Sequence, residues 1–214
     1  MGELDHLFAN NRLWVAQMLA RDPRFFQRLT GQQAPEYLWI GCADSRVPAN
    51  EITGLLPGEL FVHRNVSNVV ALNDPNCLAV IRYAVDVLRV RHIIVCGHVG
   101  CGGVEAVLDG RSLGASDGWL DYVRAVRDKH RDQLSALAPG ARSRRLCELN
   151  VIEQVLNVAR TDIVRDAWSR HQSIGIHGWI YAVGNGLLRD LGISLTGPED
   201  APARYDVALQ SLTP

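Results

Sequence analysis

The chain has 214 residues, 47% of them hydrophobic, and its 22 Lys and Arg nearly balance its 23 Asp and Glu, which leaves a formal charge of −1. This composition suffices for one good-sized core and argues against a basic surface for nucleic acid. No run approaches the ~18 apolar residues of a membrane span and the N-terminus lacks the pattern of a secretory leader, so we expect a single cytoplasmic domain over residues 1–214 with no membrane contact.

The first part of the chain has the periodicity of helices. Apolar residues recur at three- and four-residue steps from Leu4 to Leu29, and Asp22-Pro23 interrupts them. We therefore predict an N-terminal helical arm, residues 1–35, that contains two helices. Because no sheet face is reserved for these helices, we expect the arm to pack across a neighbouring subunit.

Three apolar runs in the middle of the chain predict strands, at residues 37–41, 60–63 and 92–95. Between the second and third runs, Asp74-Pro75 supplies an acidic cap and a first-turn proline for a helix that continues to residue 89. If the first and third strands lie side by side in one parallel sheet, their carboxyl ends form the edge at which such sheets bind ligands.

The second half of the chain alternates between helical and strand patterns. Glycines after residue 98 indicate a tight turn into a helix at 104–108. Further helices are predicted at 119–130, at 146–169 and, as a short one, at 187–191, and a strand is predicted at 174–181. The proline-bearing tail, residues 198–214, is expected to be loosely held.

Metal-ligating residues follow two of the predicted strands. Cys42 comes directly after the first strand, and His98 and Cys101 come after the third. Two thiols and an imidazole suit tetrahedral zinc. Structural zinc sites usually gather two close pairs of ligands, whereas here Cys42 stands alone, so the pattern favours a catalytic site with an optional fourth ligand.

Asp44 and Arg46 follow Cys42 in the same segment, Cys42-Ala43-Asp44-Ser45-Arg46. Turned toward the metal, Asp44 is a fourth ligand and excludes water. Turned toward Arg46, whose guanidinium can bind a carboxylate with two hydrogen bonds, it leaves the metal open. We expect the two residues to act as a switch and as a catalytic pair, with Asp44 orienting a zinc-activated water.

Five segments of the sequence resemble the β-class carbonic anhydrases, which interconvert carbon dioxide and bicarbonate. They are CADSRVP, HVGCGG, ELFVHRNVSN, LCELNV and IHGW. The resemblance implies a mainly parallel α/β sheet flanked by helices, N-terminal helical arms and a homo-oligomer, a dimer or a tetramer. It also implies one zinc ion per subunit, held by Cys42, His98 and Cys101, and attack of zinc-bound hydroxide on carbon dioxide.

The same resemblance implies a substrate pocket across a subunit boundary. Gln33 and Phe61 would face it, near Val66, Tyr83 and Gly102.

A second implied site binds bicarbonate away from the zinc. Trp39, Arg64 and Tyr181 match the positions used by the bacterial bicarbonate-regulated (type II) subgroup, in which the bound anion turns Asp44 onto the metal and inactivates the enzyme. In this sequence Asn50 stands where relatives often have an acid that can pair with Arg64.

Other functions stay open at this stage. The same fold could hydrolyse carbonyl sulfide or carbon disulfide, or the chain could be a non-catalytic sensor of zinc or bicarbonate. A nucleotide-binding domain is the least favoured alternative, because neither glycine-rich turn, at 97–102 or at 184–186, completes the GxGxxG motif.

Overall fold

The computed structural model describes residues 2–31 and 33–212. The chain divides into two compact units, Met1–Gln33 and Ala34–Pro214. None of the helices that the structure describes is long and apolar enough to cross a lipid bilayer.

The N-terminal unit consists of helices α1 (Asp5–Arg21) and α2 (Phe25–Leu29), as the sequence predicts. The rings of Trp14, Phe25 and Phe26 pack edge to face, with centroids 5.0–6.4 Å apart, and join the two helices. No residue of α1 is buried, and its Leu7, Phe8 and Leu13 are exposed.

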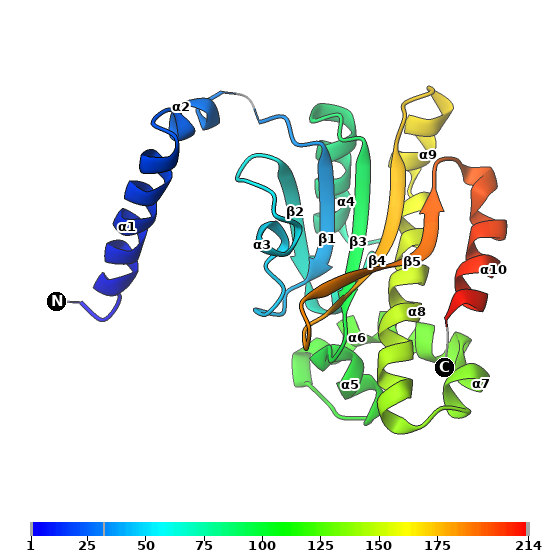
Figure 1. The fold of residues 1–214 in the computed structure, drawn as a ribbon. Helices are drawn as coiled ribbons and strands as arrows, with labels where there is room; N and C mark the ends of the chain where they lie inside the picture. Colours follow the sequence, from blue (N-terminus) through cyan, green and yellow to red (C-terminus); the bar gives the residue numbers. More distant parts are fainter. Residues whose placement is uncertain (1, 32, 213–214) are drawn as a thin grey trace. The chain divides into compact units, whose positions relative to one another are not determined.

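A sheet of five strands organises the second unit among the residues described (Figure 1). Its strands are β1 (Tyr37–Cys42), β2 (Leu60–Asn65), β3 (His92–His98), β4 (Gly175–Ala182) and β5 (Leu187–Leu195). The spatial order is β2-β1-β3-β4-β5, and every pair is parallel except β4 with β5. The predicted mainly parallel α/β fold is therefore confirmed. Because β1 and β3 are neighbours, the ends of both strands meet at one edge of the sheet.

Helices surround this sheet. They are α3 (Ala49–Thr53), α4 (Pro75–Arg82), α5 (Gly102–Leu108), α6 (Asp117–Lys129), α7 (Arg131–Ser135), α8 (Pro139–Arg160), α9 (Asp162–Ser169) and α10 (Ala201–Ser211). Asp74 caps α4 as predicted: its side chain accepts a hydrogen bond from the backbone N–H of Asn76.

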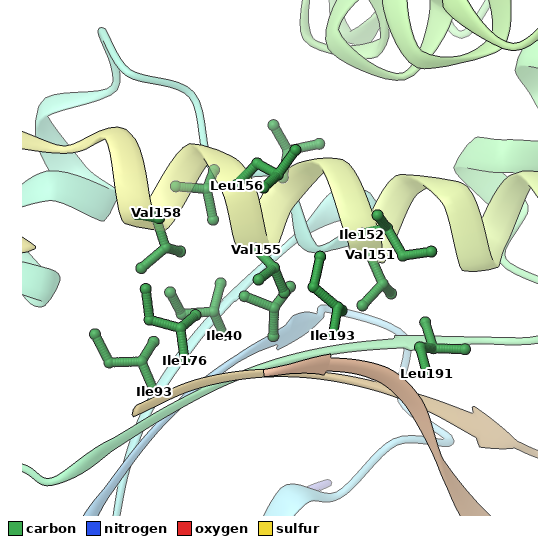
Figure 2. Packing of buried hydrophobic residues seen from close by; sticks show 14 of the residues in the cluster. Ile40, Ile93, Val151, Ile152, Val155, Leu156, Val158, Ile176, Leu191 and Ile193 are labelled. Atoms are coloured by element: carbon green, nitrogen blue, oxygen red, sulfur yellow. The ribbon is translucent and has the colours of Figure 1, made fainter. Parts of the chain in front are cut away.

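The larger core lies between the sheet and α8. Figure 2 shows Val155 and Val158 of α8 pointing toward the sheet, where Ile93 and Ile176 come from neighbouring strands. All four residues are fully buried, and the full burial of one such side chain contributes about 1.5–3 kcal/mol to the stability of the fold. A smaller cluster, which includes Trp39, packs separately from this core.

Two predicted helices are wrong. The run at 187–191 is part of strand β5, because pairing with β4 prevails over the local helix preference of its Leu and Arg residues. The predicted helix 146–169 is two helices, since Thr161 has extended backbone and its hydroxyl accepts a hydrogen bond from the N–H of Val164 to cap α9.

The C-terminal segment is ordered where the sequence predicts a loosely held tail. Residues 201–211 form α10, which packs on β5 and α8, and Ala208 and Leu212 are buried in the larger core. Tyr205 of α10 donates a hydrogen bond to the carboxylate of Glu153 on α8 over 2.7 Å. The apolar contacts and this polar contact hold the segment, while residues 213–214 lie outside the described residues.

Candidate metal centre

The ends of β1 and β3 bring the predicted ligands together. Cys42 is the last residue of β1, His98 is the last of β3, and Cys101 precedes the first turn of α5. Gly100, with φ of +74°, makes the tight turn that returns Cys101 toward the strand ends.

The donor atoms of Cys42, His98 and Cys101 all lie within 4.8 Å of one another, and all three residues are buried. The two sulfur atoms are 3.9 Å apart. Two thiolates on one tetrahedral zinc, with bonds of ~2.3 Å, have their sulfurs about 3.8 Å apart, so the observed spacing fits one cation and not a disulfide.

The imidazole of His98 is oriented for the same cation. Its Nδ1 lies 3.2 Å from the carbonyl oxygen of Val99 and donates to it, which leaves Nε2 as the nitrogen with a lone pair. Nε2 is buried and has no hydrogen-bond partner in the part of the chain that the structure describes. A buried polar atom without a partner is costly, and a cation between the two sulfurs would satisfy it.

The two cysteines form a coupled pair. The hydrogen bond between the sulfurs lowers the pKa of Cys101 and raises the pKa of Cys42. Hydrogen bonds from Ser67 and from the backbone N–H of Val104 further stabilise the Cys101 thiolate. The pair is thus suited to bind one positive charge, which a metal ion can provide.

Asp44 is turned toward Arg46. The guanidinium donates from Nε to Oδ1 over 2.9 Å and from Nη2 to Oδ2 over 2.7 Å, and Nη2 also donates to the carbonyl oxygen of Gly100. These hydrogen bonds hold the pKa of Asp44 well below its usual range. Oδ2 nevertheless lies only 3.7 Å from Nε2 of His98, so Asp44 borders the metal position without closing it.

The structure places the residues expected to line a substrate pocket at two different edges of the sheet: Val66 and Gly102 follow Asn65 and Cys101 at the metal edge, whereas Phe61 pairs with Leu38 near the starts of β2 and β1, and Tyr83 packs on Phe61. The rings of Phe61 and Tyr83 have centroids 5.8 Å apart, Val66 is 42% exposed, and Gly102 is exposed at the start of α5. Gln33 is exposed at the end of the N-terminal unit.

One of the residues expected to bind bicarbonate has a hydrogen-bond donor without a partner among the described residues. Trp39 and Tyr181 belong to the same buried cluster, and the indole Nε1 of Trp39 has no hydrogen-bond partner among the residues described. The indole lies against Gly41, where a Cβ atom would collide with Nε1. The ring therefore requires glycine at this position and leaves one buried N–H available.

Arg64 contacts the metal loop directly. Its Nε donates to the carbonyl oxygen of Cys42 over 2.8 Å, and its Nη2 donates to the carbonyl oxygen of Asp44. Asn50 donates to the carbonyl oxygens of Leu55 and Leu56.

Sequence reasoning did not place Ser67. Its hydroxyl lies 3.4 Å from the sulfur of Cys101, although it comes from the turn after β2. The sequence gives only indirect evidence for its position: if β2 pairs with β1, the residues just after β2 lie beside Cys42.

A second group of possible ligands was also missed. Donor atoms of His63, Asp74 and Cys77 lie within 4.8 Å of one another. Asp74 is already the cap of α4, and burial raises the pKa of the Cys77 thiol to about 12. Both features favour roles in capping and packing.

Comparisons with known proteins agree with this geometry. The sequence profile of the family described as "Carbonic anhydrase" matches residues 37–188. A carbonic anhydrase of Emericella nidulans is 48% identical over 194 residues, which cover 90% of this chain and 85% of that protein. The structure of Coccomyxa beta-carbonic anhydrase in complex with acetazolamide is 40% identical, with a TM-score of 0.91 and full coverage of both chains. A structure from Sordaria macrospora, one of two beta-carbonic anhydrases described as tetrameric, is 37% identical, has a TM-score of 0.86 and covers 90% of this chain and 98% of that one.

Proposed function

The chain belongs to the β-class carbonic anhydrases and is an enzyme of that family, and we propose that it hydrates carbon dioxide reversibly with one zinc ion held by Cys42, His98 and Cys101. The observation that carries the zinc assignment is the buried Nε2 of His98, which has no hydrogen-bond partner among the described residues and lies beside two sulfurs 3.9 Å apart. Zinc bound there would lower the pKa of a water molecule from 15.7 toward ~7 and so supply hydroxide at ordinary pH.

The residues around this position have separate tasks. Asp44, held outward by Arg46, keeps a carboxylate oxygen free to accept a hydrogen bond from a water at the metal position and to orient it. Val66, just after β2, offers an apolar surface at this position for a small uncharged substrate, and Phe61 would reach the pocket from a neighbouring subunit. Arg46 sets the state of the switch, because Asp44 becomes a fourth ligand if the arginine releases it.

Zinc analysis combined with stopped-flow hydration of carbon dioxide tests the proposal. We expect one zinc per chain and fast hydration in the natural protein, and loss of both in Cys42→Ser and His98→Ala. Cys77→Ala, which removes a buried thiol outside the site, should keep the zinc. A His98→Ala protein without zinc that hydrates carbon dioxide at the natural rate would refute the mechanism.

We further propose that bicarbonate regulates the enzyme, as in the type II subgroup. The free indole N–H of Trp39 can donate to an anion, and the phenol of Tyr181 is in the same cluster. An anion that draws Arg64 toward it would weaken the bonds from Arg64 to the carbonyl oxygens of Cys42 and Asp44. The metal loop would then be free to move Asp44 onto the metal.

We also propose a homo-oligomer in a reducing compartment such as the cytoplasm. The exposed apolar residues of α1 favour a contact with a second copy, and the relatives from Sordaria macrospora are described as tetrameric. All five cysteines are buried free thiols, which suits a reducing environment. A monomeric mass in light scattering at micromolar protein would contradict the oligomer.

A further inference from the structure

Ser67 places a buried hydroxyl beside one of the proposed zinc ligands. Its Oγ lies 3.4 Å from Sγ of Cys101, and the residue is 0% exposed. Among the residues that the structure describes, the hydrogen-bond partner of the Ser67 hydroxyl is this sulfur. A thiolate that binds a metal has no proton to give, so in the loaded enzyme the hydroxyl is the donor and the sulfur the acceptor.

The backbone at Ser67 adopts a conformation that is costly for a residue with a side chain. Ser67 has φ of 65° and ψ of 26°, and Asn68 follows with φ of 47°, so two consecutive residues other than glycine are left-handed. Such conformations persist where the surroundings hold them and cluster at functional sites.

The long helix α8 supplies part of that support. Nδ2 of Asn150 donates to the carbonyl oxygen of Ser67 over 2.8 Å. Nearby, Oε1 of Gln154 accepts from the N–H of Val70 over 2.9 Å, and Nε2 of Gln154 donates to Oδ1 of Asn150 over 3.0 Å. The turn is thus hydrogen-bonded at both of its ends to amides of one rigid element, and this fixes where the Ser67 hydroxyl points.

Helix α5 leaves room for the hydroxyl. A Cβ atom on Gly103 would collide with Oγ of Ser67. The glycine in the first turn of α5, just after Cys101, therefore permits the serine to approach the sulfur.

We propose that Ser67 is a positioning residue that donates a hydrogen bond to the Cys101 thiolate and thereby limits the negative charge this ligand gives to the zinc. The inference rests on the proposed zinc site and goes beyond it. A ligand that donates less charge leaves the cation a stronger Lewis acid, so the hydroxyl partly offsets the presence of two thiolates in the ligand set.

Cobalt(II), substituted for zinc in the full-length enzyme, tests this proposal through the sulfur-to-cobalt charge-transfer absorption. We expect Ser67→Ala to move this band to longer wavelength, because a thiolate without the hydrogen bond is more easily oxidised. A role limited to folding would leave the band where it is.

Two further variants keep the test decisive. Ser67→Gly also removes the hydroxyl, but glycine adopts the left-handed backbone without strain. It therefore separates the loss of the hydrogen bond from a change in backbone strain, and it should move the band in the same direction. Ser169→Ala removes an exposed hydroxyl elsewhere and should leave the band unchanged. If both Ser67 variants absorb at the natural wavelength, the inference is overturned. If the natural protein with cobalt shows no thiolate band at all, the proposed zinc site fails, and this inference fails with it.

Discussion

Replacement of Glu153 by glutamine should destabilise the protein in a pH-dependent way. The carboxylate lies on α8 with its side chain 8% exposed, and it accepts two hydrogen bonds of 2.8 Å from Nζ of Lys129, one from Nε2 of His130 and one from the hydroxyl of Tyr205. Burial raises the pKa of Glu153, but these donors outweigh it and hold the pKa at about 2 instead of the usual 4.5. Glutamine keeps the shape and loses the charge.

The size of the effect follows from that lowering. A carboxyl whose pKa falls from 4.5 to about 2 on folding contributes about 3 kcal/mol to stability at neutral pH. Because Lys129 is 48% exposed, screening by solvent reduces the expected loss to about 2 kcal/mol. Since the folded pKa is lowered, this stability is present above pH 4.5 and is lost as the pH falls from 4.5 toward 2.

Urea unfolding of both proteins at pH 7 and at pH 3 measures the difference. We expect Glu153→Gln to be less stable by about 2 kcal/mol at pH 7 and the gap to narrow strongly at pH 3. Glu199→Gln, at an exposed position, is the matched control and should stay within ~0.5 kcal/mol of the natural protein at both pH values. A gap of equal size at pH 7 and pH 3 would refute the assignment of this energy to the charge.

Three other substitutions test the site and the fold. Arg46→Ala releases Asp44 toward the metal and should slow hydration about 10- to 100-fold, with Arg46→Lys intermediate; a natural rate in Arg46→Ala would exclude the switch. Trp39→Phe removes the free indole N–H and should raise the bicarbonate concentration for half-inhibition about tenfold, so an unchanged inhibition curve would argue against the anion site. Thr161→Ala removes the cap of α9 and should lower the free energy of unfolding by about 1 kcal/mol, with Thr161→Ser close to the natural protein; equal losses in both variants would contradict capping by the hydroxyl.

The convergence of Cys42, His98 and Cys101 could be predicted from the sequence, because the residue types indicate a metal site and the predicted strand ends indicate where these residues meet. Cys42 and His98 each end an apolar run, and the carboxyl ends of adjacent parallel strands meet. His98 and Cys101 are close in sequence, so one tight turn at Gly100 is enough to bring their side chains together. The outward position of Asp44 could not be predicted, since ligation to the metal and pairing with Arg46 use the same side chain.

The errors in the fold occur where distant contacts decide the local structure. Residues 187–191, the predicted short helix, have helix-forming side chains, yet pairing with β4 makes them part of strand β5. Apolar periodicity continues across Thr161, so one helix is predicted, although the hydroxyl of Thr161 begins a second helix there. The prolines of the tail predict a loosely held segment, but Ala208 and Leu212 are buried in the larger core, which forms only once the sheet is assembled.

The ligands of the metal centre come from two strands that are neighbours in space but far apart along the chain, with β2 and α4 between them in sequence. A nascent chain that has emerged only as far as Cys42 offers one sulfur, and a fragment that starts after it offers one imidazole and one sulfur. If zinc binds these residues as proposed, its high-affinity binding requires that β1 and β3 have paired, and metal uptake is then a late event that reports completed folding.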